Sequence, residues 1–148
     1  MAFLSIWIHL VWSTKNREPL MSGMDVRRMI FGHVAENAEK KGIGLDCING
    51  GNDHAHALIS LGADQTIAKI AQLLKGESAH WVNERCLLRH KFEWQDEYYA
   101  VSVSESRLFS LREYIRNQEE HHRKRTFAEE FEKFLRDSDF ERSIKIGG

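Results

Sequence analysis

Two histidines placed two residues apart are the first feature of this sequence with chemical potential. The stretch GGNDHAHALIS, residues 50–60, has the pattern of a buried β-strand and contains His54 and His56. Successive side chains of a strand point to opposite faces, so the two imidazoles share one face while Ala55 and Ala57 point to the other. The pair can hold one metal ion together. An H-x-H pattern alone is a weak motif, because either histidine can equally be hydrogen-bonded in a core.

A second group of candidate residues lies nearer the C-terminus, in the stretch REYIRNQEEHH. Tyr114 and Gln118 are four residues apart and therefore share one face of a predicted helix. A helix laid beside the histidine strand would bring two imidazoles, an amide oxygen and a phenol around one ion. The simpler alternative is that Tyr114, next to Leu111 and Ile115, is half-buried packing.

A third candidate is His9, which alternates onto the more polar side of the first predicted strand. It either supports the histidine pair or is a hydrogen-bonded core histidine, and we favour the core interpretation. His121 and His122 are expected first as surface residues.

Length and composition predict one globular domain spanning residues 1–148, with a polar tail over the last ~10 residues. Of the 148 residues, 42% are hydrophobic and 29% are charged. The apolar run 2–12 is interrupted by Ser5 and His9 and has no basic segment before it, so it predicts neither a signal peptide nor a membrane span. We therefore expect a cytoplasmic protein with no membrane partner.

The two cysteines argue against a disulfide-stabilised fold, and the charge distribution leaves nucleic-acid binding open. Cys47 and Cys86 are too few and too far apart for a disulfide framework and are expected to be core thiols. The net charge of -1 does not indicate a nucleic-acid binder, but basic residues gather in 85–91 and 112–125. Such runs are usually solvated faces, although a local basic surface is all that nucleic-acid binding needs.

Periodicity predicts the elements that must position these residues. Residues 3–12 alternate as a first strand. Ser22 and Asp25 resemble a capping box for a helix that runs to about Lys41. A strand through 43–47 then turns at Asn49-Gly50 into the histidine strand, which makes a hairpin.

The second half of the chain repeats this alternation of helix and strand. Asp64 or Thr66 caps a helix, and a fourth strand is expected from Phe92 to Val103. A third helix follows Ser104 or Ser106, and its predicted apolar side consists of Leu108, Leu111 and Ile115. Thr126 and Glu129 form a capping box before a last amphipathic helix.

The order β-α-β-β-α-β is that of the ferredoxin-like (split β-α-β) fold, in the α+β class. It predicts an antiparallel sheet with two helices on one face, extended by C-terminal helices that carry the tyrosine. This architecture hosts many functions and does not decide the chemistry.

Several motifs in this order resemble the single-tyrosine HUH transposases of small bacterial and archaeal insertion sequences. They are IHLVWSTKNREP, Asp53-His54-Ala55-His56, LLKGESAHW, FEWQDEYYAVSVS and YIRNQEEHHRKRTF, which together span nearly the whole chain. Two positions depart from the usual family pattern. Asn52 stands where a proline often precedes the histidine motif, and Glu97 stands where a glycine often precedes the tyrosine of the aromatic strand.

The resemblance implies a function and a set of roles. His54, His56 and Gln118 would bind a divalent cation, Mg²⁺ or Mn²⁺, and Tyr114 would be the nucleophile. The protein would cut and rejoin single-stranded DNA through a 5′-phosphotyrosine intermediate and recognise hairpins near the ends of an insertion sequence. It would be a homodimer in which the tyrosine helix of one subunit can serve the histidine pair of the other. The candidates for phosphate contacts are Lys69, Lys75, Arg112, Arg116, Arg123 and Lys124.

Other functions remain open at this point. A domesticated relative that acts on chromosomal repeat hairpins would keep the same site. A non-catalytic nucleic-acid-binding module can share the fold, although AFLSIWIHLVW lacks the glycine-flanked aromatic pattern of an RNA-recognition strand. A histidine-triad hydrolase needs a third histidine where this chain has Leu58, and a two-motif phosphoesterase would need a second histidine strand.

Overall fold

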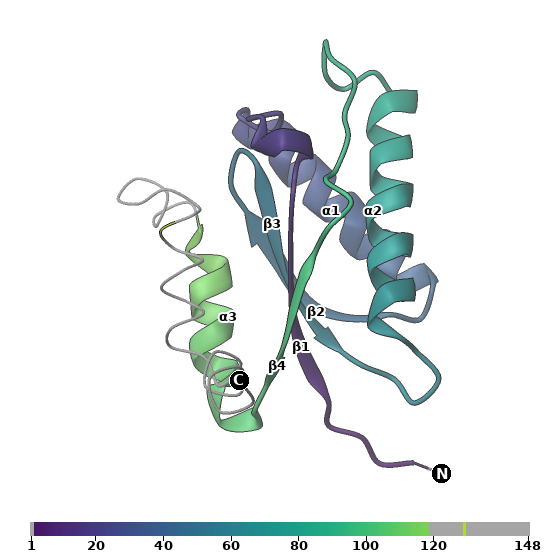
Figure 1. The fold of residues 1–148 in the computed structure, drawn as a ribbon, viewed down its shortest axis with the longest axis vertical. Coiled ribbons are helices and arrows are strands. Elements are labelled where there is room, and N and C mark those ends of the chain that lie inside the picture. The colour runs from purple at the N-terminus through teal and green to yellow at the C-terminus, as the bar shows by residue number, and fades with distance from the viewer. Residues whose placement is uncertain (1, 119–128, 130–148) are drawn as a thin grey trace.

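The computed structural model describes residues 2–118 and residue 129. Within these residues, four strands form one antiparallel sheet with the strand order β2-β3-β1-β4 (Figure 1). The elements in chain order are β1 (Trp7–Ser13), η1 (Lys15–Arg17), α1 (Met24–Lys40), β2 (Gly44–Gly50), β3 (His54–Ser60), α2 (Ile67–Glu84), β4 (Tyr99–Val103), η2 (Glu105–Arg107) and α3 (Leu108–Arg116). The predicted α+β class and the β-α-β-β-α-β order are confirmed.

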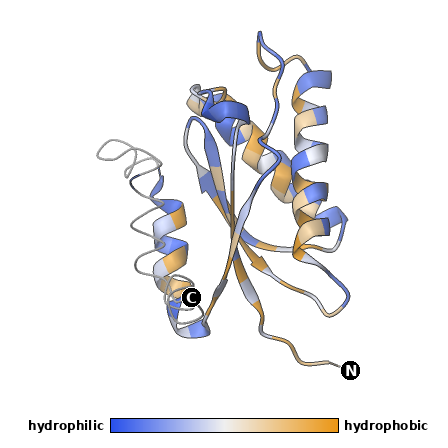
Figure 2. Cartoon of the chain, viewed as in Figure 1, coloured by the Kyte–Doolittle hydropathy of each residue, from blue (hydrophilic) through white to orange (hydrophobic). Residues whose placement is uncertain are grey.

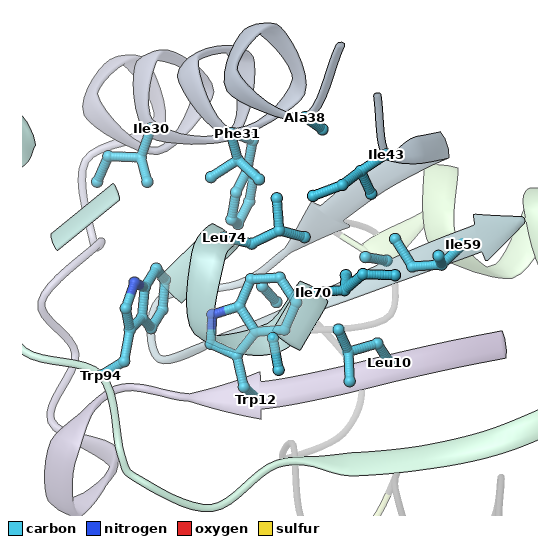
Figure 3. Packing of buried hydrophobic residues seen from close by; sticks show 14 of the residues in the cluster. Leu10, Trp12, Ile30, Phe31, Ala38, Ile43, Ile59, Ile70, Leu74 and Trp94 are labelled. Atoms are coloured by element: carbon cyan, nitrogen blue, oxygen red, sulfur yellow. The ribbon is translucent and has the colours of Figure 1, made fainter. Parts of the chain in front are cut away.

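The sheet separates two layers of helices. Helices α1 and α2 lie side by side over one face, and α3 lies over the other (Figure 1). Hydrophobic residues recur along β1, α1 and α2 (Figure 2). The main core forms between the sheet and these two helices, where Trp12 meets Trp94 edge to face at 5.7 Å between ring centroids (Figure 3).

A second, smaller apolar cluster holds α3 against the sheet. Leu108, Leu111 and Ile115 of α3 pack on Leu58 of β3, and all four are buried. This is the apolar side predicted for the third helix. Because strand residues alternate, Leu58 points to the same face as the two histidines, and α3 is thereby placed over them.

The observed helix starts differ in how well the sequence predicted them. Thr66 caps α2, and its side chain accepts a hydrogen bond from the backbone N–H of Lys69. The capping box predicted at Ser22 and Asp25 is wrong, because α1 begins after Gly23 with no side-chain cap. Helix α1 is instead stabilised by the packing of its buried face against the core.

The turn predicted at Asn49-Gly50 is also wrong. Both residues belong to β2, where they pair with His56 and Ala55, and the chain turns over residues 51–53. A side chain at Gly50 would collide with the carbonyl oxygen of His54. The glycine thus permits close strand contact rather than a turn.

Two strands are shorter than their sequence patterns suggest. The first begins at Trp7 rather than residue 3, and Phe3 is 92% exposed. The fourth begins at Tyr99 rather than near residue 92. Phe92 and Trp94 are buried in the main core, and Trp94 makes only an isolated bridge to Thr14.

The last predicted helix lies outside the described residues, apart from Glu129, which is helical. In the part of the chain that the structure describes, no helix is long and apolar enough to cross a membrane.

Candidate functional site

Strand β3 places the two histidines under α3. In the pairing of β3 with β1, His54 lies opposite Ser13 and His56 lies opposite Val11. Both imidazoles are fully buried. Their ring centroids are 5.0 Å apart and the rings are nearly perpendicular. The predicted common face is therefore confirmed, and it is the face that α3 covers.

Asp53 orients His54. Its Oδ1 atom lies 2.9 Å from Nδ1 of His54. An ionised carboxylate only accepts hydrogen bonds, so Nδ1 carries the proton. In the neutral imidazole, Nε2 then carries the lone pair, which points away from Asp53 as a metal ligand requires.

Gln118 faces that nitrogen. Its Oε1 atom lies 3.1 Å from Nε2 of His54, and its amide nitrogen donates to the carbonyl oxygen of Tyr114 at 3.3 Å. The latter bond orients the amide so that its oxygen faces the histidine. Two acceptor atoms face each other when His54 is neutral, and such a contact is favourable only with a proton or a cation between them.

His9, on the neighbouring strand β1, contacts His56. Its Nε2 atom lies 2.9 Å from Nδ1 of His56, and the two rings are stacked. Burial lowers the pKa of His9 to about 3, so the ring is neutral near pH 7. When Nδ1 of His56 donates to His9, the lone pair of the His56 imidazole is on Nε2. His9 is the buried, hydrogen-bonded histidine that we expected, and the residue that it contacts is His56 of the candidate site.

Tyr114 completes the group. Its ring lies against His56 with centroids 5.5 Å apart and an interplanar angle of 87°. The hydroxyl oxygen is buried, while the residue as a whole is partly exposed. The structure therefore brings together all four residues singled out from the sequence: His54, His56, Tyr114 and Gln118.

The donor set fits a divalent cation. In the part of the chain described here, no three His, Cys, Asp or Glu side chains form a metal-binding group, so the amide oxygen of Gln118 would be needed as a third protein ligand. The 3.1 Å between that oxygen and Nε2 of His54 suits adjacent ligands of an octahedral ion with bonds of about 2.1 Å, which lie about 3 Å apart.

The β2–β3 turn that carries Asp53 is fixed by residues the sequence analysis did not identify. The backbone N–H of Thr14 donates to the carbonyl oxygen of Asp53 at 2.8 Å. The buried guanidinium of Arg27 donates to Asn52 Oδ1 at 2.9 Å and to the carbonyl oxygen of Met21 at 3.0 Å. Arg27 lies on the buried face of α1, where a lone arginine in a helical pattern carries no signal of this role.

Polar bonds supplement the apolar contact between α3 and the sheet. Arg112 forms a two-pronged ion pair with Asp46 of β2, with distances of 2.9 and 3.0 Å. Asn49 donates to the carbonyl oxygen of Arg116 at 3.1 Å. These bonds hold the helix that carries Tyr114 over β2 and β3.

The predicted phosphate-binding residues are not gathered in one place. Lys69 and Lys75 belong to α2, across the sheet from the histidines. Arg112 and Arg116 belong to α3, where Arg112 is paired with Asp46. Arg123 and Lys124 lie outside the described residues. All six remain predictions as DNA contacts.

Comparisons with known proteins place these features in context. Residues 2–118 match the family described as "Transposase IS200 like". No curated protein matches the chain.

Two solved structures share the fold. One, from Deinococcus radiodurans R1 and described as a transposase, is 23% identical, with a TM-score of 0.62, covering 80% of this chain and 95% of its own. The other is a REP-associated tyrosine transposase bound to a REP hairpin. It is 12% identical with a TM-score of 0.53, covering 78% of this chain and 66% of its own.

Proposed function

The chain belongs to the family of IS200-like transposases, and from that premise we propose that it cuts and rejoins single-stranded DNA by transesterification at Tyr114. The observation that carries the proposal is the meeting of β3 and α3. Gln118 lies 3.1 Å from His54, and the ring of Tyr114 lies against His56. A nucleophile and three candidate ligands thus converge from segments 60 residues apart in the sequence.

The proposed step exchanges one phosphodiester for another. The phenol oxygen of Tyr114 forms a bond to phosphorus while the bond from phosphorus to the 3′ oxygen breaks. The phenol proton passes to solvent, and the leaving oxygen takes up a proton to become a 3′ hydroxyl. Because the 5′-phosphotyrosine retains the energy of a phosphodiester, a 3′ hydroxyl from another DNA end can reverse the step without ATP.

The residues around Tyr114 have defined roles in this proposal. His54, His56 and Gln118 would hold Mg²⁺ or Mn²⁺, which when bound draws negative charge from a nonbridging phosphate oxygen. Asp53 and His9 position the two imidazoles through their Nδ1 atoms. Gln118 is itself positioned by its bond to the carbonyl of Tyr114, so the nucleophile and one ligand move as a unit.

The burial of the Tyr114 hydroxyl bears on how DNA would enter. Movement of α3 away from β3 would expose this oxygen to a phosphodiester. The bonds of Arg112 to Asp46 and of Asn49 to Arg116 would then break. We propose that α3 is exchanged within a homodimer, so that the tyrosine of one subunit serves the histidines of its partner.

A hairpin is the DNA structure we propose for recognition. The fold neighbour bound to a REP hairpin supports this choice, and it equally favours a second candidate, a domesticated enzyme that acts on chromosomal repeat hairpins. Both candidates use the same site and differ in the DNA that flanks the gene.

Covalent adduct formation tests the proposal. The purified protein is incubated with Mg²⁺ or Mn²⁺ and labelled single-stranded DNA that contains the hairpin from its own flanking sequence. We expect a covalent protein–DNA band that Tyr114→Phe abolishes while DNA binding persists. Tyr98→Phe is a matched control, because Tyr98 packs against the main core and should leave the band unchanged.

His54→Ala separates the roles of the site. It should abolish the adduct through loss of the cation while Tyr114 remains in place. An adduct that survives in Tyr114→Phe would refute the assignment of the nucleophile.

A further inference from the structure

A polar and aromatic pocket lies beside the histidine pair. It has a volume of about 380 Å³ and is lined among others by Ser13, Asn16, Arg17, Gln95, Glu97 and Tyr99. Small-molecule sites have volumes of about 300–1,000 Å³, so one nucleobase with its sugar fits this space. None of these residues belongs to the candidate catalytic group.

Strand β1 links the pocket to the candidate catalytic residues. Ser13 is paired with His54 across the strands and points to the same face. Nε of Arg17 lies 3.8 Å from Oδ2 of Asp53, the carboxylate that orients His54. The pocket therefore opens next to the place where the phosphodiester would be held.

Tyr99 forms an aromatic wall at the edge of the sheet. It is paired with Val11, which is paired with His56 on its other side, so all three point to one face. Two strand spacings of about 4.8 Å put Tyr99 roughly 10 Å from His56 along the sheet. While Val11 and His56 are buried, Tyr99 is 55% exposed. An exposed aromatic ring next to a DNA site is suited to stacking on an unpaired base.

Gln95 and Glu97, which also line the pocket, are held in place by hydrogen bonds. Oε1 of Gln95 accepts from the backbone N–H of Asn16 at 3.0 Å, and its amide nitrogen donates to Oε2 of Glu97 at 3.0 Å. From the other side of the segment, Lys75 donates to the carbonyl oxygens of Asp96 and Glu97 at 2.8 and 3.4 Å. Gln95 thus orients the carboxylate of Glu97, while Lys75 holds the backbone of Asp96 and Glu97.

The charges of the pocket indicate which part of a nucleotide it accepts. A phosphate would be repelled by Glu97, whereas a carboxylate accepts hydrogen bonds from an exocyclic amino group. The guanidinium of Arg17 lies at the end nearest Asp53, where it can attract the phosphate. A nucleotide would therefore place its base toward Tyr99 and Glu97 and its phosphate toward the histidines.

We propose that this pocket binds the unpaired base of a nucleotide next to the scissile phosphate and selects adenine, cytosine or guanine over thymine. Tyr99 stacks on the base and Glu97 accepts from its amino group. Thymine has no amino group, and its N3–H lies between two carbonyl oxygens that the carboxylate would repel. The location of the scissile phosphate rests on the proposed function. The base selection does not, because it follows from the pocket alone.

Equilibrium binding of short single-stranded oligo-dA, oligo-dC and oligo-dT tests the proposal, measured by fluorescence anisotropy in EDTA. Tyr99→Ala should weaken binding of oligo-dA and oligo-dC about tenfold, as expected for loss of one base stack. Tyr99→Phe should bind as the wild type does. Phe3→Ala is the control for removal of an exposed aromatic ring, because Phe3 is 92% exposed and does not line the pocket.

Glu97→Gln tests base selection. The wild type should bind oligo-dC more tightly than oligo-dT, and this ratio should fall toward one in the variant, because an amide can donate to thymine as well as accept. A midpoint of thermal unfolding equal to that of the wild type would show that each variant is folded.

The outcomes distinguish the subsite from the catalytic proposal. Equal binding by Tyr99→Ala and wild type, no binding of any oligonucleotide by the wild type, or a dC-to-dT ratio unchanged in Glu97→Gln would overturn the subsite. EDTA removes the divalent cation, so these results do not depend on catalysis. If the subsite variants behave as expected but no adduct forms in the presence of metal, only the proposed transesterification fails.

Discussion

Each histidine of the pair has a neighbouring side chain in contact with its Nδ1 atom. Asp53 accepts from Nδ1 of His54, and His9 faces Nδ1 of His56. The carboxylate of Asp53 places the proton on Nδ1 of His54 and the lone pair on Nε2, and His56 has the same arrangement when its Nδ1 donates to His9. The nitrogen chemistry of the site therefore depends on two residues that would not themselves touch the metal.

Asp53→Asn should weaken Mn²⁺ binding about 10- to 100-fold, the usual cost of losing a residue that orients a metal ligand. An asparagine can present its N–H to Nδ1 and so favour the wrong tautomer of His54. Isothermal titration calorimetry would measure the affinity. Glu84→Gln, at an exposed carboxylate that pairs with His80, serves as the control. Unchanged affinity in Asp53→Asn would show that Asp53 does not orient His54.

The two cysteines should differ in reactivity. Burial, followed by the neighbouring Asp46 carboxylate, raises the pKa of the Cys47 thiol to about 11, while Cys86 is exposed. Only about one Cys47 thiol in a thousand is then ionised at pH 8, and the thiolate is the reactive form. Iodoacetamide at pH 8 should label Cys86 first, and labelling of Cys47 should increase as the pH approaches 11. Peptide mass spectrometry would detect a reversed order, which would contradict the raised pKa.

At the scale of elements, helices α1 and α2 end in the same hydrogen-bonding motif with different residues. Gly42 has a φ of 69° and donates to Glu39, and Ile43 donates to Ala38. Cys86 has a φ of 51° and donates to Asn83, and Leu87 donates to Val82. Glycine adopts this left-handed conformation without strain, whereas a residue with a Cβ does not.

Cys86→Gly should therefore raise the free energy of unfolding by about 0.5–1 kcal/mol, after the entropy that glycine adds to the unfolded chain. Gly42→Ala should lower it by about 1 kcal/mol. A Cβ at Gly42 would meet no atom within 4 Å, so the cost is conformational rather than steric. Chemical denaturation would measure both. Stabilisation by Gly42→Ala, or a loss of stability in Cys86→Gly, would contradict the shared motif.

The same two helix ends show what the sequence could predict. A glycine after an amphipathic run is a recognised stop signal, so the end of α1 was predicted within one residue. The end of α2 had no such signal, because the left-handed position is occupied by Cys86. The alternation in β3 and the four-residue spacing in α3 predicted which side chains would face each other. The support from Arg27 depends on a tertiary contact with the β2–β3 turn that no local pattern encodes.

For the whole molecule, the antiparallel sheet and the two helices on one of its faces followed from the order of the elements, because the ferredoxin-like connection permits few alternatives. The extent of β4 did not. Phe92 and Trp94 have the residue types of a strand, but they are buried by packing on the main core rather than by sheet pairing. Hydrophobic pattern alone does not separate these two ways of burying an aromatic residue.

Placement of α3 on its own sheet leads to a prediction about the assembled protein. If α3 is exchanged between subunits, a heterodimer of Tyr114→Phe with His56→Ala contains one intact site, made from the tyrosine of one subunit and the histidines of the other. Neither homodimer contains one. Mixed and refolded subunits should therefore regain covalent adduct formation on hairpin DNA. A mixture as inactive as the separate variants would show that Tyr114 acts on the histidines of its own chain.

Identification of the residue that becomes linked to DNA tests transesterification at Tyr114 without relying on any variant. The wild-type protein is reacted with hairpin DNA and Mn²⁺, digested with nuclease and trypsin, and analysed by mass spectrometry. We expect a nucleotide phosphate on Tyr114, in a peptide that begins after Arg112. A nucleotide on Tyr98, Tyr99 or a serine, or a cleaved DNA with no covalently linked peptide, would contradict it.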